Sequence, residues 1–469
     1  MAISRSGHVL VVGGGIAGIA CAVRLSEAGV RVTLLETRKK LGGRATSFDD
    51  VRSGETLDNC QHVVLGCCTN YLDLLERLGV ADQIRWTREQ YWIEEGGRTS
   101  VVRPATLPPM PAPLHFSWSF LRAKFLTLSE ASAIGRCCIA MLRVDRRRET
   151  DRTFAAFLRQ HGQSDRAIRR FWEPVIVSAC NLSCDRVAAS SAIHVFQEGF
   201  LANARAAEVG VSKVPLVRLY ERVAPLLART GGVIELGAGI ANVNARSARA
   251  TDGRTWNADA VVCATPVERV VRLIDDETRR TDPRFAGLDR FTHSPILGVH
   301  LRFDRGVMGD LPHCVLVERG VQWLFRKSDE GSSVHAVISA ADAWLDLSEG
   351  EIGDRVTRDL HACLPASRSA RLISARAVKE KLATFAPTPG LDALRPSPTG
   401  PSGIVLAGDY TATGWPATME GAARSGYAAA AALLNQSTPD RVIDPPDVGV
   451  LPGLAVSPLA RALGLRTLG

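Results

Sequence analysis

Three glycines near the beginning of the chain constrain its fold more than any other feature. Gly13, Gly15 and Gly18 follow the apolar run HVLVV and open a helical pattern, IAGIACAVRLSEAG, after which VRVTLLE ends at Glu36. This order predicts a strand, a tight turn, a helix and a second strand. The first glycine permits the turn, the second lets the backbone approach a diphosphate, and the third lets helix and strand pack closely. The segment therefore predicts a Rossmann-like dinucleotide-binding unit in an α/β protein.

Glu36 narrows the choice of nucleotide. A carboxylate at the end of the second predicted strand can bind both hydroxyls of an adenosine ribose. The same carboxylate disfavours a 2′-phosphate, so NADP is not expected. The helix N-terminus would hold the diphosphate with its free N–H groups and its partial positive charge.

Composition excludes several classes of protein. The chain has 469 residues, of which 46% are hydrophobic and 23% charged, so a sizeable core and more than one domain are expected. The formal net charge is 57 − 49 = +8, which is mildly basic and suits an anionic phosphate or membrane surface. The charge is too weak and too scattered to predict nucleic-acid binding.

The cysteines indicate a reducing compartment. There are 11 of them, several in doublets, and no signal peptide is expected before them. No pair of CxxC motifs occurs, so no metal site is expected. No uncharged apolar stretch reaches the roughly 18 residues needed to span a bilayer. We therefore expect a cytoplasmic protein, with contact to the inner face of the membrane left open.

A second motif, KLGGRATS at residues 40–47, indicates which dinucleotide is bound. It resembles the RxGGRxxS segment of the amine oxidase and phytoene desaturase flavoprotein superfamily. Lys40 replaces the first arginine of that pattern and keeps its charge. The resemblance implies FAD as the cofactor, with Arg44 beside the diphosphate and Gly43 letting the chain pass close to the flavin.

The far end of the chain carries a third motif for the same ligand. An apolar strand is predicted in GIVLAGD, and a helix rich in small residues follows in MEGAARSGYAAAAALL. The resemblance implies that Asp409 binds the ribityl or diphosphate part of FAD. It also implies that the backbone of Met419, at the helix N-terminus, faces the flavin O2 edge. A residue near Ile240 would contact the adenine through its backbone.

These separated motifs predict an interleaved architecture. The expected fold is a Rossmann-like FAD-binding domain combined with a mixed α+β substrate domain, as in the amine oxidases. The FAD-binding domain is expected at 1–66, 206–285 and 396–436, and the substrate-binding domain at 67–205 and 286–395. The first substrate segment reads mainly as helices and the second mainly as strands. A Pro-rich tail is expected at 437–469.

The run LDNCQHVVLG, residues 57–66, is hard to explain by packing alone. Buried polar groups cost free energy unless they are paired, and this run places several beside apolar residues. The resemblance implies that it runs along the isoalloxazine ring. His62 is then the candidate acid, Asp58 could orient it or serve instead, and Gln61 could hold a substrate hydroxyl. The alternative is that His62 and Asp58 only tie down a loop.

The wider pattern resembles the hydroxysqualene dehydroxylases, also called squalene-associated FAD-dependent desaturases. The resemblance covers most of residues 8–435 and is carried by DNCQHVVLGCCTNYLDLLERLGV, CNLSCDRVAASSAIHVFQEGF, VPLVRLYERVA and GDYTATGWPATMEGAARSGY. Cys60 departs from the family pattern, in which glycine is expected. The resemblance implies reductive dehydroxylation of hydroxysqualene to squalene, a step of isoprenoid and hopanoid precursor synthesis. Protonation of the hydroxyl would release water, and hydride from reduced flavin would quench the carbocation.

Two other enzyme classes share these motifs. A carotenoid or phytoene-type desaturase would remove hydride on the same fold, because fold does not determine function. An amine oxidase is less favoured, since only 6% of residues are aromatic and an aromatic cage is not evident. The expected partners are a hydrophobic C30 isoprenoid and a separate electron donor or reductase. The apolar run at 107–121 and the tail are the candidates for peripheral membrane contact.

Overall fold

The structure is a computed structural model that describes residues 3–4, 7–106, 109–435 and 449–465. Residues 107–108 of the Pro-rich run, and residues 437–448 and 466–469 of the expected tail, lie outside the described residues. Within the described part, no helix is long and apolar enough to cross a membrane.

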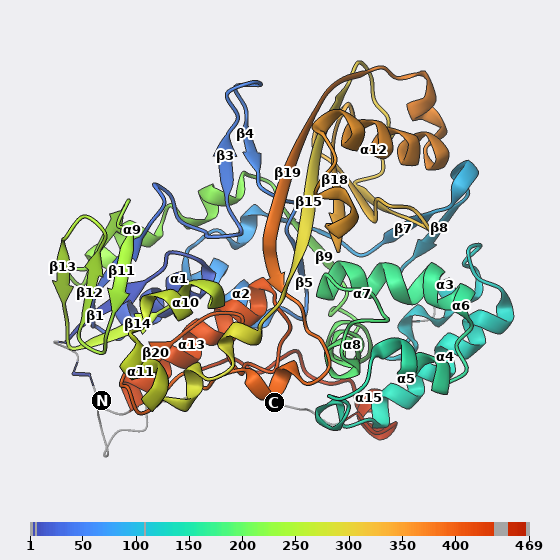
Figure 1. The fold of residues 1–469 in the computed structure, drawn as a ribbon. Helices are drawn as coiled ribbons and strands as arrows, with labels where there is room; N and C mark the ends of the chain where they lie inside the picture. The colour runs from blue at the N-terminus through green and yellow to red at the C-terminus, as the bar shows by residue number, and fades with distance from the viewer. Residues whose placement is uncertain (1–2, 5–6, 107–108, 436–448, 466–469) are drawn as a thin grey trace.

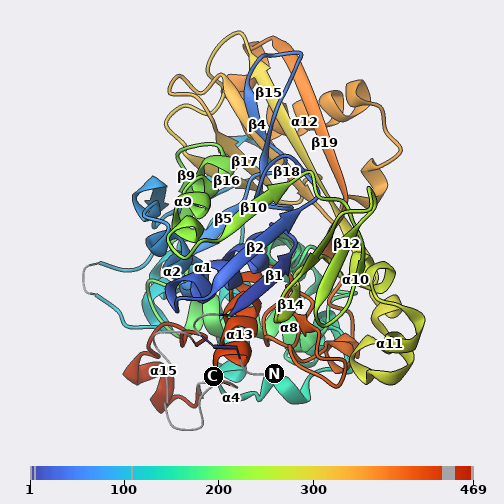
Figure 2. The ribbon, with the colours of Figure 1, turned by 90° about the vertical axis from the view of Figure 1, so that its left-hand side faces the viewer.

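A five-stranded parallel sheet forms the centre of the left-hand part of the molecule in Figure 1, and Figure 2 shows it from that side. Its strands, in spatial order, are β10 (Val233–Leu236), β2 (Arg31–Glu36), β1 (His8–Val12), β14 (Ala260–Cys263) and β20 (Val405–Leu406). Every neighbouring pair is parallel. The sheet therefore combines strands from the beginning, the middle and the end of the chain, as the separated motifs predict.

Both faces of this sheet are covered, which explains why β1 is apolar at nearly every position. Val9 and Val11 pack in one core with α1 (Ile16–Glu27) and α13 (Met419–Asn435). Leu10 and Val12 pack on the other side. That side is covered by the antiparallel strands β11 (Ile240–Val243), β12 (Ser247–Ala250) and β13 (Thr255–Asn257), and by α10 (Val267–Leu273).

A seven-stranded mixed sheet lies at the upper right of the molecule in Figure 1. In spatial order its strands are β19 (Leu372–Phe385), β15 (His293–Phe303), β18 (Ser333–Ser339), β17 (Trp323–Arg326), β16 (His313–Leu316), β7 (Gln90–Ile93) and β8 (Thr99–Val102). One face packs on α12 (Glu349–Cys363) through Val299, Ala336 and their neighbours. Side chains alternate along a strand, so His300 and His335 lie on the opposite face.

Two small sheets lie between these layers and hold the polar run. The first pairs β3 (Ser47–Asp49) with β4 (Thr56–Asp58). The second, in spatial order, contains β5 (Val63–Leu65), β9 (Val209–Ser212) and β6 (Ile84–Thr87). The residues from Asn59 to His62 connect β4 to β5.

A helical part lies below the seven-stranded sheet, at the lower right of Figure 1. It contains α3 (Ser117–Leu121), α4 (Leu128–Arg143), α5 (Phe154–Gln160), α6 (Asp165–Ala167), α7 (Glu173–Cys180) and α8 (Ala189–Phe196). From the expected tail, α15 (Pro458–Ala462) packs into the same core through Ala460. The other α-helices of the described part of the chain are α2 (Thr69–Arg77), α9 (Val223–Ala228) and α11 (Asp276–Thr281).

The local expectations and the structure differ in three places. Strands β6, β7 and β8 interrupt a segment that reads as mainly helical, and α12 interrupts one that reads as strands. Helix α2 packs through Leu74 and Leu75 in the core of α1 and α13, although it lies in the segment expected to form the substrate domain. The domain limits themselves stay a prediction.

Candidate active site

The three glycines of the first motif shape the turn between β1 and α1. Gly13 has φ +112°, and its N–H donates to Leu35 O at 2.8 Å. A Cβ added to Gly18 would lie 1.9 Å from Gly13 O, so only glycine allows helix and strand to approach this closely. No side chain caps the N-terminus of α1, which begins after Gly15. Its first N–H groups are therefore suited to bind a diphosphate.

The carboxylate of Glu36 lies against this turn. Its Oε2 accepts the Gly14 N–H at 2.7 Å, and its Oε1 accepts the Arg38 N–H at 2.7 Å. The segment that precedes Ile240 is held beside the same strand end, because Ala238 N–H donates to Glu36 O at 2.9 Å. Ile240, the first residue of β11, is half-buried. The structure thus places the segment that leads to Ile240 beside the strand end that carries Glu36.

The GGR segment crosses directly over the turn. Gly42 N–H donates to Gly14 O at 2.8 Å, and a Cβ on Gly43 would lie 3.0 Å from Gly15 Cα. Arg44 reaches the far end of the chain, where its Nη2 donates to Asp409 Oδ1 at 2.7 Å. An ion pair therefore joins the GGR segment to the GD segment near the end of the chain. The side chain of Asp409 in this pair is only 8% exposed.

The start of α13 is tied to α2 by a residue to which the sequence assigned no role. Glu420 follows Met419 and is fully buried. Its carboxylate accepts the backbone N–H groups of Asn70, at 3.2 Å, and Tyr71, at 2.8 Å, and pairs with Arg424 at 2.7 Å. Glu420 therefore satisfies free donors at the α2 N-terminus and positions the beginning of α13.

The polar run is paired rather than solvated. Asp58 Oδ1 accepts from Ser47 Oγ at 2.7 Å and from the Leu216 N–H at 2.9 Å. Asn59 donates its side-chain amide to Arg44 O, which fastens the run to the GGR segment. Asp58 and Gln61 are both buried. These contacts support a loop-holding role for Asp58 and also place the run beside the expected flavin site.

His62 is half-buried, and its tautomer follows from its neighbour. Its Nδ1 lies 3.0 Å from Cys60 O, and a carbonyl can only accept, so Nδ1 carries the proton. In the neutral ring Nε2 is then free to accept one. Burial lowers the pKa of His62, and Arg44 adds to this effect, while Cys60 O and Asp58 oppose it. The neutral ring is therefore favoured near pH 7, and an acid role requires that a proton be delivered to it.

Three polar residues above the run were not singled out by the sequence. His300 Nε2 donates to Asp58 O at 2.8 Å, and His300 stacks on His335 with ring centroids 3.9 Å apart. Lys327 Nζ lies 3.1 Å from Gln61 Oε1. The only sequence signal for the two histidines is the alternation in SVHAVIS and ILGVHLRF, which places each histidine on the face opposite the apolar residues. That signal does not tell which segment the face covers.

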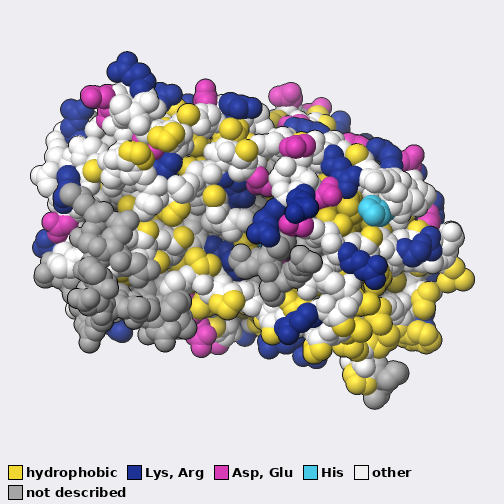
Figure 3. Space-filling view, turned by 90° about the horizontal axis from the view of Figure 1, so that it is seen from below, with side chains coloured by type: hydrophobic (Ala, Val, Ile, Leu, Met, Phe, Trp, Pro, Cys, Tyr) yellow, Lys and Arg dark blue, Asp and Glu magenta, His cyan; other side chains and the backbone are white. Residues whose placement is uncertain are grey.

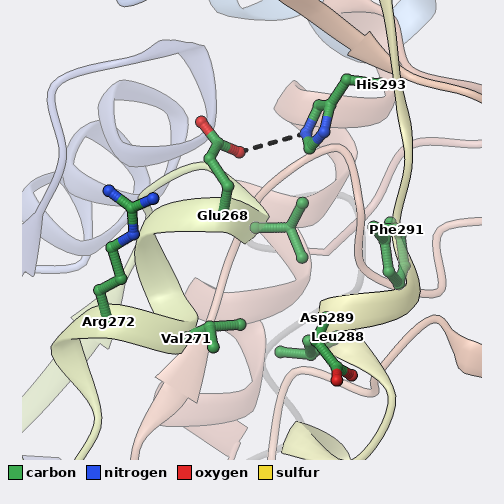
Figure 4. A pocket seen from close by; sticks show the side chains of 8 residues that line it. Glu268, Val271, Arg272, Leu288, Asp289, Phe291 and His293 are labelled. Atoms are coloured by element: carbon green, nitrogen blue, oxygen red, sulfur yellow. Dashed lines mark ion pairs between the residues drawn. The ribbon is translucent and has the colours of Figure 1, made fainter.

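A separate cavity of about 220 Å³ lies between α10 and the beginning of β15 (Figure 4). It is lined by Val267, Glu268, Val271, Arg272, Leu288, Asp289, Phe291 and His293. Glu268 Oε2 lies 3.3 Å from His293 Nε2. Burial alone would raise the pKa of Glu268, but His293 and Arg44 hold it below its ordinary value. None of the residues singled out by the sequence lines this cavity.

Comparison with known proteins finds a matching family model and several relatives. The family model described as "Flavin containing amine oxidoreductase" matches residues 16–434. The 15-cis-phytoene desaturase of an Oncidium hybrid cultivar is 26% identical over 455 residues, which cover 91% of this chain and 78% of that protein. The hydroxysqualene dehydroxylase of Sinorhizobium fredii is 28% identical over 458 residues, covering 92% and 99%.

Solved structures share the fold. Cyclohexylamine oxidase from Brevibacterium oxydans superposes with a TM-score of 0.67 at 18% identity, over 92% of this chain and 99% of that one. An oxidoreductase from Methanosarcina mazei gives 0.68 at 16% identity, over 89% and 98%. These likenesses confirm the expected fold class, a Rossmann-like part interleaved with a mixed α+β part.

Proposed function

The chain belongs to the flavin containing amine oxidoreductase family, and on that premise we propose that this FAD-dependent oxidoreductase converts hydroxysqualene to squalene. The observation that carries the proposal is the paired polar run Asp58–His62, which lies beside the FAD-binding motifs. Removal of a hydroxyl needs a proton donor at the site, whereas removal of hydride from a hydrocarbon does not. The match to a hydroxysqualene dehydroxylase over 99% of that protein's length also supports it.

The described residues fit FAD. Gly13, Gly15 and Gly18 would hold its diphosphate at the α1 N-terminus, and Glu36 would bind its ribose. Arg44 would lie beside the diphosphate, Asp409 would bind the ribityl or diphosphate part, and the backbone of Met419 would face the flavin O2 edge. When bound and reduced, FAD supplies a hydride.

The chain's own residues then have three tasks. Gln61 would bind the substrate hydroxyl, and His62 would protonate it through Nε2, the ring nitrogen that Cys60 O leaves free. Val63 and Leu65, which follow His62 in the chain, belong to one hydrophobic cluster with Phe325. Such a surface would exclude water from the carbocation formed when the hydroxyl leaves.

An anaerobic half-reaction tests the proposal. The FAD-loaded protein is reduced with dithionite, mixed with hydroxysqualene, and followed by flavin absorbance and by mass spectrometry of the product. Flavin reoxidation with squalene formation is the expected result. His62→Ala should slow the reoxidation strongly, and full turnover by that variant would remove His62 from the mechanism.

Carotenoid-type desaturation is the second candidate, because phytoene and zeta-carotene desaturases match this chain at similar identity. In that case the reduced protein would not react with hydroxysqualene. The flavin of the oxidised protein would instead bleach on addition of an isoprenoid such as phytoene or squalene. The same instrument and protein sample therefore separate the two reactions.

The helical part presents an apolar surface that suits a substrate stored in membranes. Figure 3 shows hydrophobic side chains gathered at the end of the molecule that carries the helical part, with Lys and Arg side chains nearby. Trp118, Leu121 and Leu128 are 54%, 51% and 70% exposed. Arg122 stacks on Trp118 at 4.5 Å. We propose that this surface rests on an anionic bilayer, with Trp118 at the interface.

Vesicle binding should depend on this surface. Trp118→Ser combined with Leu121→Ser should weaken binding to phosphatidylglycerol-containing vesicles at least tenfold, because each side chain loses roughly 1.5–3 kcal/mol of burial. Binding of the wild type should also fall at high salt. Flotation measures both effects. Leu236→Ser, at a leucine on β10 whose exposure is similar to that of Leu121, is the matched control, and equal loss in that variant would contradict the proposal.

The Arg44–Asp409 pair should be needed to retain FAD. Asp409→Asn removes a charge-assisted hydrogen bond of roughly 1.5–3 kcal/mol, so FAD affinity should fall about tenfold or more. Flavin absorbance after gel filtration measures the loss. Asp392→Asn is the control, because Asp392 pairs with Arg395 at a more exposed position. Unchanged FAD content in Asp409→Asn would show that the pair does not organise the site.

The electron donor is proposed to be a separate protein or small molecule. The sequence carries one dinucleotide-binding motif, which the FAD fills. On this proposal, the electrons reach the flavin from outside this chain.

A further inference from the structure

The described part of the C-terminal tail, residues 449–465, runs from the start of α13 to the helical part, and we call it the clasp. Residues 449–455 form neither helix nor strand, and none of them is buried. From Val456 onward the clasp is anchored, because Val456, Ala460 and Leu465 pack in the core of the helical part. A segment without buried side chains opens at little free-energy cost. The clasp is therefore suited to open at its first end while α15 stays docked.

Hydrogen bonds hold the first end of the clasp to α2. Leu451 N–H donates to Asn70 Oδ1 at 2.7 Å, and Asn70 Nδ2 donates to Leu451 O at 3.1 Å. Two residues of neighbouring antiparallel strands exchange bonds in the same way. Thr69 Oγ1 adds a bond to Pro452 O at 3.1 Å. The fully buried Asn70 side chain therefore serves the clasp as a strand partner would.

The same bonds lead to the start of α13. Asn70 Nδ2 also donates to Glu420 Oε1 at 2.8 Å. Arg424, the ion-pair partner of Glu420, donates its Nη2 to Leu451 O at 3.3 Å. Leu451 O is thus shared by two residues that hold the same buried carboxylate. Because Glu420 follows Met419 directly, continuous contacts lead from the clasp to the backbone proposed to face the flavin.

Trp415 provides a second connection. It lies in the loop between Asp409 and Met419 and belongs to a hydrophobic cluster against which Leu454 of the clasp packs. Arg424 lies over the Trp415 ring, 5.0 Å from its centroid. Opening of the clasp would therefore remove a packing contact from the loop that joins the two residues expected at FAD.

The other end of the clasp is fastened to the helical part. Asn203 Nδ2 donates to Ala455 O at 2.8 Å, and Ser457 N–H donates to Ala202 O at 2.8 Å. Ser457 Oγ donates to Ala112 O at 2.7 Å, within the Pro-rich run that precedes α3. The clasp therefore links the start of α13 to the helical part through contacts at both ends.

We propose that FAD and the clasp strengthen each other's binding. FAD bound at Met419 holds the start of α13 in place, and the contacts of Glu420 with Asn70 and Arg424 then hold Leu451. Linkage requires the reverse effect, because a clasp that closes more tightly on the FAD-bound protein must raise the affinity for FAD by the same factor. The inference rests on the proposed place of FAD at Met419. It holds for either candidate reaction, since both need the cofactor.

Amide hydrogen exchange of the apo and the FAD-loaded protein tests the first direction. FAD should slow exchange in 449–455 by about tenfold, which is within the usual range of coupling between two sites. The amide of Leu451 is protected only while the clasp is closed on Asn70. Helix α12, which packs on the seven-stranded sheet, is the control and should change much less. No slowing in 449–455, or equal slowing in α12, would overturn the coupling.

Truncation tests the reverse direction. A chain that ends at residue 448 lacks the clasp and should bind FAD more weakly by about tenfold, the same factor as the slowing of exchange. Titration with FAD, followed by flavin fluorescence, measures the affinity. A chain that ends at residue 465 keeps the clasp and should match the full chain. Unchanged affinity in the shorter chain would contradict the proposal.

Leu451→Pro keeps α15 in place and serves even where the shorter chain fails to fold. Leu451 precedes Pro452, so its backbone already favours an extended conformation, and the substitution removes mainly the N–H that Asn70 accepts. FAD affinity should fall about threefold, as expected for the loss of one hydrogen bond. Val450→Pro is the matched control, because the Val450 N–H has no hydrogen-bond partner among the described residues.

The outcomes separate the clasp from the reaction. Equal FAD affinity in Leu451→Pro, Val450→Pro and the wild type would reduce the clasp to a packing element. A wild type that retains FAD but leaves hydroxysqualene unchanged would refute the proposed reaction, and both measurements on the clasp would stand.

Discussion

Replacing Gly18 with alanine is expected to destabilise the protein by about 3 kcal/mol or more and to abolish FAD retention. The new methyl group would lie 1.9 Å from Gly13 O and 3.3 Å from the Ala264 side chain. The first contact is with backbone, so it can be relieved only by moving α1 away from β1. We therefore expect a free-energy cost at the upper end of the range for overpacked cores. Such a movement would also displace the helix N-terminus from the diphosphate. Urea unfolding and flavin absorbance measure the two losses.

Gly135 provides the matched control. It lies at an exposed position within α4, and an added Cβ would meet no atom within 4 Å. Gly135→Ala should therefore stabilise the protein by about 0.5–1 kcal/mol, because alanine loses less backbone entropy in a helix than glycine does. If both variants unfolded at the same urea concentration as the wild type, the close approach at Gly18 would be wrong.

Acid should destabilise the folded chain well above the pH at which its carboxylates titrate. Burial lowers the pKa values of His115 and His313 to about 4, from an ordinary value of 6.5. Above pH 6.5 both rings are neutral in the folded and the unfolded chain. Between pH 6.5 and about 4 only the unfolded chain takes up these protons, so the free energy of unfolding falls as pH falls. The loss amounts to roughly 3 kcal/mol per histidine.

His115→Phe isolates one of the two protons. The ring of His115 is fully buried, neither nitrogen has a partner among the described residues, and it lies 4.2 Å from the Phe116 ring. Phenylalanine fills a similar space and does not titrate. The slope of unfolding free energy against pH, measured by urea unfolding near pH 5, should be smaller in the variant by about 1.4 kcal/mol per pH unit. An identical slope in both proteins would mean that His115 is protonated in the folded state.

The parts of the site that follow from local rules could be predicted from the sequence. The turn at Gly13 and the close packing at Gly18 depend on residues within one strand–turn–helix unit, whose pattern is written in consecutive positions. The strand before Asp409 and the helix after it were predicted in the same way, whereas the role of Asp409 at FAD is implied by the family resemblance and stays a prediction. The family resemblance then linked these separate units to one cofactor.

Residues whose role depends on long-range contact could not be found this way. Lys327 meets Gln61 only because a hairpin of the seven-stranded sheet lies over the polar run. Glu420 could be recognised as the beginning of a helix, but its contact with the α2 N-terminus joins positions 350 residues apart. The same limit explains α2 itself, whose amphipathic pattern predicts a helix but does not tell which core receives its apolar side.

The parallel sheet has a consequence for how the protein is made. Among the residues that the structure describes, strand β20 pairs only with β14, and α13 covers a face already bordered by α1. While the chain is being synthesised, β1, β2, β10 and β14 can assemble long before these last elements emerge from the ribosome. Until then the apolar edge of β14 and the bare side of α1 are open to other chains, which is a known route to aggregation. Cofactor capture is therefore expected to be a late event, and a supply of FAD at that moment should raise the yield of folded protein.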